Sequence, residues 1–203
     1  MREWDSDRCF CIYIGGNAMK QLKRLDIMVD LETLSHKSKA PMIQLSAELF
    51  DIETGEVLDA FNKYISDDDV TISRGTINWW LDNHPMQLKR VLKRGNVSTK
   101  EALADFQGWV YRSMNGFKLT LKDVYLWGNG ILFDNRILFD HMGDSYPIFY
   151  RNDRDMRTLV DMYTTKFGIS PWDVIKVENT HDALEDCENQ ILIVTHCWKE
   201  LMK

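Results

Sequence analysis

Several acidic residues of this sequence stand where they would lie close together and partly withdrawn from water. Asp30 and Glu32 are two positions apart at the end of an apolar strand predicted for residues 25–30, so both side chains leave the same face of that strand. Two carboxylates held this close repel each other unless they share a proton or a cation. The alternative is a strand that merely ends in solvent, and the Asp-x-Glu pair alone does not exclude it.

Two further acids and one histidine follow at separate places in the chain. Asp134 shares the expected inward face of a helix with Ile131 and Leu138, where a carboxylate is costly without a partner. An acid in the first turn of a helix is also favoured by the helix dipole, which is the competing interpretation. Asp186 flanks the apolar stripe of a helix near the end of the chain. His181 precedes that helix on a loop, where a lone histidine is more often structural than catalytic.

The four carboxylates are more informative as a set than one by one. They arise on three separate elements, each near the carboxyl end of a predicted strand or on a helix beside it. Four carboxylates suit two hard, oxygen-seeking cations such as Mg²⁺ or Mn²⁺. Two such ions, about 3.5–4 Å apart, can hold the attacking and leaving oxygens of a phosphodiester. The acids therefore predict metal-assisted phosphodiester hydrolysis.

The elements that must position these residues can be predicted from hydrophobic periodicity. Residues 42–50 alternate apolar and polar side chains, which is typical of a half-buried strand, whereas the short apolar run at 123–127 is typical of a central, buried one. Further strands are predicted at 57–65 and 147–150. Helices are predicted around Trp79, from Pro85, from the capping sequence 98–101 to Arg112, around Asp134, and at 155–166 and 181–201. This order predicts an α/β fold, a mixed five-stranded sheet flanked by helices.

Composition limits the number of domains and the class of protein. The chain has 203 residues, 44% of them hydrophobic and 28% charged, which is enough for one sizeable core. We expect residues 1–24 to be an N-terminal extension and residues 25–203 to form the single domain. Because no run of about 18 apolar residues occurs and residues 1–8 lack the pattern of a secretory signal, we expect neither a membrane span nor export.

Charge, cysteines and motifs exclude several other classes of protein. With a net charge of −6, the chain can bind nucleic acid only through local basic groups or metal. The glycines at 15–16 and 128–130 make neither a P-loop nor a dinucleotide fingerprint. The acidic loop 67–73 lacks the glycine and glutamate of an EF-hand. The four cysteines have no zinc-site spacing and favour a reduced intracellular setting; they are Cys9, Cys11, Cys187 and Cys197.

Three motifs taken together resemble those of a known enzyme family. Asp30-Leu31-Glu32-Thr33-Leu34 resembles the first motif of the DEDD 3′–5′ exonucleases, Trp127-Gly128-Asn129-Gly130 with Phe133-Asp134 the second, and His181-x₄-Asp186 the third in its histidine (DEDDh) form. The segments 77–80 and 154–158 resemble a narrower branch, which contains bacteriophage exonuclease A proteins and a related actinobacterial exoribonuclease. The resemblance covers roughly residues 25–203.

This resemblance implies a ribonuclease H-like fold, two divalent ions (Mg²⁺ or Mn²⁺) and removal of nucleotides from the 3′ end of single-stranded DNA or RNA. Carried over by position, Asp30 bridges both ions, Glu32 and Asp186 complete the site of one, and Asp134 binds the other. His181 deprotonates the attacking water, a task that an imidazole pKa near 6.5 suits around neutrality. The implied setting is the cytoplasm of a bacterium or of a phage-infected cell, and a homodimer is left open.

Substrate contacts are predicted for residues beside the acids and for aromatic and basic side chains. Trp79 and Trp80 can stack on terminal bases, worth about 1–3 kcal/mol per base, although we expect at least one of them to be a core residue. By resemblance, Arg154 and Arg157 guide the strand or support the metal site. A basic stripe at 89–94 is either a phosphate contact or a solvated helix face. The remaining predicted contacts are Leu31, Thr33, Leu34, Asn129 and Asn135.

Two other functions compete with this one. A non-catalytic nucleic-acid-binding or scaffold protein could keep the same fold, but all four acids and His181 are present here. An endonuclease of the ribonuclease H-like group is disfavoured by the His-x₄-Asp spacing. DNA cannot be told from RNA by these motifs, because that choice depends on contacts with the 2′-hydroxyl.

Overall fold

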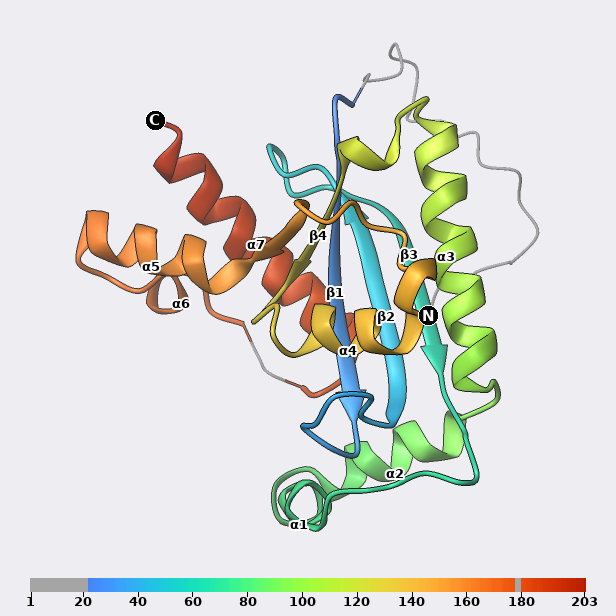
Figure 1. The fold of residues 1–203 in the computed structure, drawn as a ribbon. Coiled ribbons are helices and arrows are strands. Elements are labelled where there is room, and N and C mark those ends of the chain that lie inside the picture. Colours follow the sequence, from blue (N-terminus) through green and yellow to red (C-terminus); the bar gives the residue numbers. More distant parts are fainter. Residues whose placement is uncertain (1–21, 178–179) are drawn as a thin grey trace.

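The computed structural model describes residues 22–177 and 180–203, and its centre is a mixed sheet (Figure 1). The strands are β1 (Leu25–Thr33), β2 (Met42–Phe50), β3 (Val57–Tyr64), β4 (Val124–Gly128) and β5 (Asp153–Asp155). Their order in the sheet is β3-β2-β1-β4-β5. β1, β2 and β3 pair antiparallel, whereas β4 and β5 continue the sheet parallel to β1. The first strand in sequence is therefore the central one in space.

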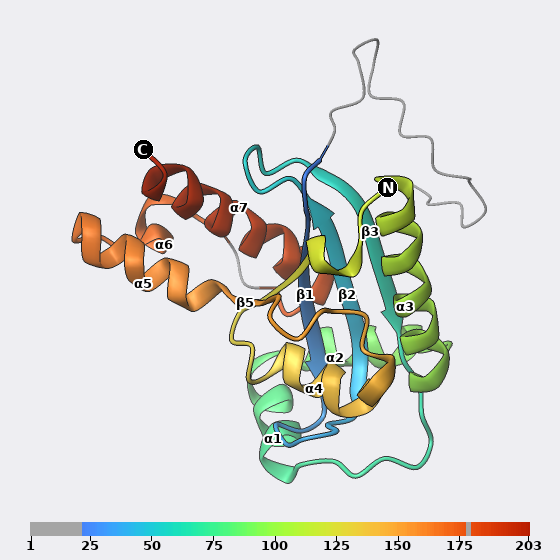
Figure 2. The same ribbon diagram turned by 45° about the horizontal axis from the view of Figure 1, so that its top comes forward.

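Helices cover both faces of the sheet and one of its ends. α3 (Thr99–Gly116) and α4 (Asp134–Met142) lie against one face, and α5 (Met156–Phe167) with α7 (Ala183–Leu201) against the other (Figures 1 and 2). α1 (Arg74–Asn83) and α2 (Pro85–Arg94) lie at the end where β1 finishes. A four-residue helix, α6 (Pro171–Val174), was not predicted. The predicted five-stranded sheet flanked by helices is confirmed.

The alternation of β1 explains why acids meet at one edge of the sheet. Leu25 and Ile27 belong to the core under α3 and α4, whereas Met28 belongs to the core under α5 and α7. Successive side chains of a strand leave opposite faces, so the next two residues on the Met28 face are Asp30 and Glu32. That face therefore changes from apolar to acidic near the carboxyl end of β1.

The prediction that β2 is half-buried was wrong, because all nine of its residues are buried. The polar face of β2 is covered by the start of α7 instead of water. Gln44 donates from Nε2 to Asp182 at 3.1 Å, and its Oε1 accepts from the backbone of Ala183 at 3.3 Å. Side chains that a two-residue period assigns to solvent thus serve as hydrogen-bond partners for a helix 138 residues further on.

The fifth strand was predicted at the wrong place. Residues 147–150 form no strand, and Tyr150 is 72% exposed. β5 lies at 153–155, where Asp153 pairs with Leu126 of β4. The buried side chain of Asn152 donates to the backbone oxygens of Lys122 and Val124, each at 2.9 Å, which fixes the chain against the start of β4. A three-residue strand held by such distant contacts leaves no periodic signal.

The remaining elements with a predicted start begin within two residues of it. Ser98 and Glu101 form the predicted capping box of α3, although that helix runs to Gly116. Cys187 and Cys197 are buried free thiols. Cys9, Cys11 and most of the predicted extension belong to residues 1–21 and lie outside the described residues. Within the described ranges, every helix is too short or too polar to cross a lipid bilayer.

Candidate active site

The four predicted acids come together from three elements. Asp30 and Glu32 project from β1, Asp134 is the first residue of α4, and Asp186 lies in the first turn of α7. Glu32, Asp134 and Asp186 are each less than one-tenth exposed. Each of these acids acts electrostatically on Asp30. Acids separated by up to 156 positions in the sequence thus form one cluster.

Burial and mutual repulsion act strongly on these carboxyl groups. Burial, followed by the charge of Asp186, raises the pKa of Glu32 to about 9. Burial raises the pKa of Asp134 to about 7 and that of Asp186 to about 6. The pKa of Asp30 is also raised well above its ordinary value, by burial and then by the charge of Asp134. A cation bound among them would reverse this effect, because it favours the charged forms.

Neutral hydrogen-bond donors hold two of the acids in place. The backbone N–H of Leu31 donates to Asp134 Oδ1 at 3.2 Å, which ties α4 to the end of β1. The side-chain amide of Gln190 donates to Asp30 Oδ1 at 2.7 Å. The sequence analysis missed Gln190, although its position four residues after Asp186 places both on one face of α7.

His181 lies on the loop before α7, beside two of the acids. Its φ is +52°, a left-handed conformation that non-glycine residues seldom adopt. Ligand atoms of Glu32, His181 and Asp186 all lie within 4.8 Å of one another. Burial and the nearby His84 lower the pKa of His181 below its ordinary value of 6.5. The imidazole is therefore neutral at neutral pH, which is the form that can accept a proton.

Aromatic rings from the α1–α2 corner enclose this histidine. The centroid of the His181 ring lies 4.1 Å from that of His84, 5.0 Å from that of Trp79 and 5.9 Å from that of Trp80. Trp80 is 2% exposed and donates from Nε1 to the backbone oxygen of Thr33 at 3.0 Å. Trp79 is 43% exposed. The expectation that at least one tryptophan is a core residue is confirmed for Trp80.

The start of α7 is anchored by a network that the sequence did not reveal. Asp182 caps the helix by accepting from the backbone of Leu184 at 3.1 Å. Its second oxygen accepts from Arg90 at 2.5 Å, and Gln44 donates to the first. Arg90 belongs to the basic stripe at 89–94, so this member of the stripe holds the loop of His181 near its place.

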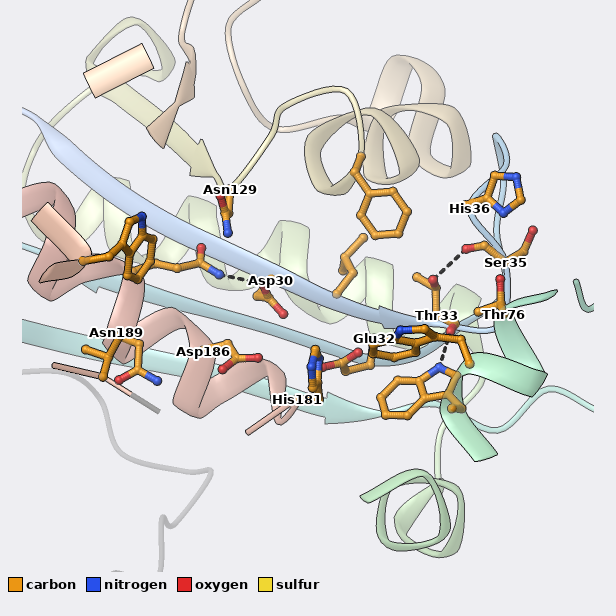
Figure 3. A pocket seen from close by; sticks show the side chains of 17 residues that line it. Asp30, Glu32, Thr33, Ser35, His36, Thr76, Asn129, His181, Asp186 and Asn189 are labelled. Atoms are coloured by element: carbon orange, nitrogen blue, oxygen red, sulfur yellow. Dashed lines mark hydrogen bonds between the residues drawn. The ribbon is translucent and has the colours of Figure 1, made fainter. Parts of the chain in front are cut away.

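A pocket of about 560 Å³ opens over the acids (Figure 3). Its size falls within the range of small-molecule sites and suits a nucleotide. Asp30, Glu32, Asp186 and His181 line it, and Figure 3 shows His181 and Asp186 facing the Glu32 side of β1. Among the predicted substrate residues, those that line it are Leu31, Thr33, Trp79, Trp80 and Asn129.

The other predicted substrate residues lie outside the lining of this pocket. Leu34 is buried in a small core with Trp80. The Asn135 amide is inside the protein, where it donates to the backbone of Leu126 at 3.2 Å and to Asp153 at 2.7 Å. Arg154 stacks on the ring of Tyr125 at 4.5 Å.

Arg157 is an exposed residue that contacts the pocket lining. Its Nε donates to Asn129 Oδ1 at 3.2 Å, and its charge lowers the pKa of Asp134 against the larger effect of burial. Arg157 is therefore placed to support Asp134 and Asn129.

Comparison with known families agrees with this arrangement of residues. The family model of the 3′–5′ exoribonuclease Rv2179c-like domain matches residues 25–198. The chain belongs to this family. The resemblance to DEDDh exonucleases is thereby confirmed, and the chain is a 3′–5′ exonuclease. No curated protein matches the sequence.

Solved structures place this 3′–5′ exonuclease domain in a wider fold group. The chain is similar to cell-death related nuclease 4 (CRN-4), with a TM-score of 0.64, 15% identity and coverage of 87% of this chain and 64% of that one. It is similar to the nuclease domain of 3′hExo, a DEDDh family member bound to rAMP, with a TM-score of 0.59, 17% identity and coverage of 88% and 93%. At such identities the likeness establishes the fold, which is the predicted ribonuclease H-like one.

A third solved structure is longer than the present chain. E. coli exonuclease I in complex with a dA16 oligonucleotide is similar with a TM-score of 0.59 and 16% identity. The match covers 88% of this chain but only 43% of exonuclease I. The present chain thus spans less than half of that enzyme and 64% of CRN-4.

Proposed function

We propose that this domain is a metal-dependent exoribonuclease that removes nucleotides one by one from the 3′ end of single-stranded RNA. One observation carries the proposal: Glu32, His181 and Asp186 offer ligand atoms within 4.8 Å of one another, and with Asp30 they line a nucleotide-sized pocket. Hard oxygen donors and a neutral imidazole converge there, as phosphodiester hydrolysis requires.

Divalent cations fit this set of residues. Glu32, Asp134 and Asp186 are buried carboxyl groups with raised pKa values, so the cluster lacks the positive charge that would keep all of them ionised at neutral pH. We assign Asp30, Glu32, Asp134 and Asp186 as the residues that hold two ions, Mg²⁺ or Mn²⁺. When bound, such ions supply Lewis-acid stabilisation of the developing phosphate charge and lower the pKa of water.

The protein's own groups divide the remaining tasks. His181 accepts the proton of the attacking water on its imidazole, since its lowered pKa keeps the ring neutral. Leu31 fixes Asp134 through its backbone N–H. The exposed ring of Trp79 offers a stacking surface at the mouth of the pocket, while the buried Trp80 holds the end of β1 by its bond to Thr33.

RNA is proposed as the substrate because the matched family is described as an exoribonuclease domain. Among proteins of the same fold, the 3′hExo nuclease domain was solved with rAMP and E. coli exonuclease I with dA16, so the fold alone does not choose between sugars. The resemblance of segments 77–80 and 154–158 to the bacteriophage exonuclease A branch favours a bacterial or phage-infected cytoplasm as the setting.

End-labelled RNA, DNA of the same sequence and a circular RNA test this proposal, each with Mg²⁺, Mn²⁺ or EDTA. We expect mononucleotides to be released from the 3′ end of linear RNA only when a cation is present, and the circle to stay intact. Asp30→Asn and Asp186→Asn, which keep shape but remove charge, should lose about 10³-fold or more of the rate while remaining folded. Cleavage of the circle would indicate an endonuclease, and no hydrolysis by wild type would indicate a scaffold protein.

A further inference from the structure

Gln190 occupies a position for which neither the motifs nor the roles assigned so far account. It projects from α7 and lines the pocket, and its amide is hydrogen-bonded to Asp30. With Asp30 ionised, as a bound cation would keep it, the nitrogen faces Asp30, because an ionised carboxylate only accepts hydrogen bonds. The hydrogen bond at 2.7 Å therefore fixes the rotation of the Asp30 carboxylate within the cluster of acids.

The choice of an amide at this position matters physically. A lysine or arginine at 190 would neutralise Asp30 and compete with any cation for it. The neutral amide orients the carboxylate without adding charge, so the other lone pairs of Asp30 stay available to a cation. Gln190 is thus suited to orient a cation ligand without replacing the cation.

The amide oxygen of Gln190 indicates that a ligand binds next to it. Gln190 is 5% exposed, and its Oε1 is buried with no hydrogen-bond donor among the residues that the structure describes. A buried carbonyl oxygen without a donor is unfavourable, so such groups are rare in folded proteins. Its carboxylate neighbours accept hydrogen bonds and do not supply a donor when ionised. The missing donor must therefore arrive with whatever enters the pocket.

We propose that Gln190 is a positioning residue with two tasks: Nε2 orients Asp30 for cation binding, and Oε1 accepts a hydrogen bond from an incoming O–H group. That group is either a cation-bound water or the 2′-hydroxyl of the terminal ribose. The inference rests on the proposed function, so its test must distinguish failure of the inference from failure of the proposed function.

Isothermal titration of the metal-free full chain with Mn²⁺ tests the first task without any turnover. Gln190→Leu removes both the donor and the unpartnered oxygen, and it should weaken Mn²⁺ binding by about 10–100-fold, as loss of a partner behind a metal ligand does. Gln190→Met, which keeps the length of the side chain, serves if the leucine variant does not fold.

Thr195→Val is a matched control on the same helix. Thr195 is also 5% exposed, and its Oγ1 also has no partner among the described residues, but it packs against Gly55 and away from the acids. Its variant should bind Mn²⁺ like wild type. Equal Mn²⁺ affinity of wild type and a folded Gln190 variant overturns the proposal.

Single-turnover hydrolysis of matched ribo- and deoxyribo-oligonucleotides identifies the O–H donor. If the ribose supplies it, Gln190→Leu lowers the preference for RNA by about tenfold, the equivalent of one hydrogen bond. If cation-bound water supplies it, both substrates lose rate equally. A wild type that binds Mn²⁺ but cleaves neither substrate contradicts the proposed function and leaves the role of Gln190 in cation binding standing.

Discussion

Burial and mutual repulsion act in the same direction on the side chains of Glu32 and Asp186. Burial is the larger cause in both, and it raises their pKa values to about 9 and about 6. His181, beside them, is shifted the opposite way, because burial disfavours its charged form. In the cation-free protein, therefore, Glu32 keeps its proton at neutral pH, Asp186 is largely ionised, and His181 is neutral. A cation bound here would favour the ionised form of Glu32 and leave the neutral imidazole of His181 able to accept a proton.

Replacement of His181 tests, at the residue scale, whether this residue is the general base. His181→Ala should lower the single-turnover rate by about 10²–10⁴-fold, the usual contribution of a general base, while substrate affinity stays close to wild type. Because the His181 pKa is lowered, the wild-type rate should fall on the acid side at a pH below 6.5, when the imidazole becomes protonated. The rate of His181→Ala should not depend on protonation of this imidazole, and it should increase at high pH.

The measurement is hydrolysis of a labelled RNA from pH 5.5 to 9 in saturating Mn²⁺. His196→Ala is the control, because His196 lies near the other end of α7 and contacts the hydroxyl of Tyr163 at 3.1 Å. The assignment of His181 as the base is wrong if His181→Ala matches the control in rate and pH profile.

At the scale of elements, the sequence predicted the strands and helix starts that depend on neighbouring residues. β1, β2 and the capped start of α3 follow from alternation and from Ser98 with Glu101, because these signals lie within a few residues of the element. The burial of Gln44 did not follow, since it depends on Asp182 far along the chain. The prediction of the fifth strand was wrong for the same reason. The basic stripe at 89–94 also did not indicate that Arg90 anchors the start of α7. The positions of the acids were predictable, but most of their supporting contacts were not.

Gly128→Ala tests an element junction on which Asp134 depends. A Cβ at Gly128 would lie 2.3 Å from Asn135 Oδ1, so the Asn135 amide would have to leave its bonds to Leu126 and Asp153. We expect a loss of about 1–3 kcal/mol in the free energy of unfolding, the cost of displacing a buried polar group. Because Asn135 follows Asp134 at the start of α4, Mn²⁺ affinity should also fall.

Urea unfolding and Mn²⁺ titration measure both effects. Gly116→Ala is the control, since a methyl group at this position, the end of α3, would have no atom of the described residues within 4 Å. It should be neutral or stabilising by about 0.5–1 kcal/mol, as for glycine in a helix. Similar urea midpoints for the two variants would contradict the close contact between Gly128 and the Asn135 side chain.

At the scale of the whole molecule, the acids shape stability as well as chemistry. Glu48 lies on β2 under α7, 3% exposed, and faces Glu188 and Cys187. Burial and then the charge of Glu188 raise its pKa to about 8 from 4.5. Between those two pH values the unfolded chain releases a proton that the folded protein keeps. The unfolded state therefore binds fewer protons, and stability falls as pH rises.

We expect the metal-free melting temperature to decline from pH 5 to 8.5, with the active-site acids acting in the same direction. Glu48→Gln should flatten this decline by about 1 kcal/mol or more at pH 8.5, about 2–4 °C for a chain of this size. Mn²⁺ should raise the wild-type melting temperature, because it binds only the assembled site. It should leave unchanged the part of the decline with pH that Glu48 causes.

Thermal unfolding in EDTA and in Mn²⁺ at several pH values measures these effects. Glu53→Gln is the control, because Glu53 is exposed in the turn after β2. An identical pH dependence for Glu48→Gln and Glu53→Gln would contradict the assignment of the decline to Glu48.

The hydrogen bond between Gln190 and Asp30 joins residues 160 positions apart, and this has a consequence for the time at which activity arises. The central strand is synthesised first, whereas His181, Asp186 and Gln190 all come with the last helix. Chain closure over such a separation has a high entropic cost, so contacts of this kind tend to form late in folding. A chain still emerging from the ribosome holds Asp30, Glu32 and Asp134 without their partners. Under the proposed function, hydrolysis therefore becomes possible only after α7 docks.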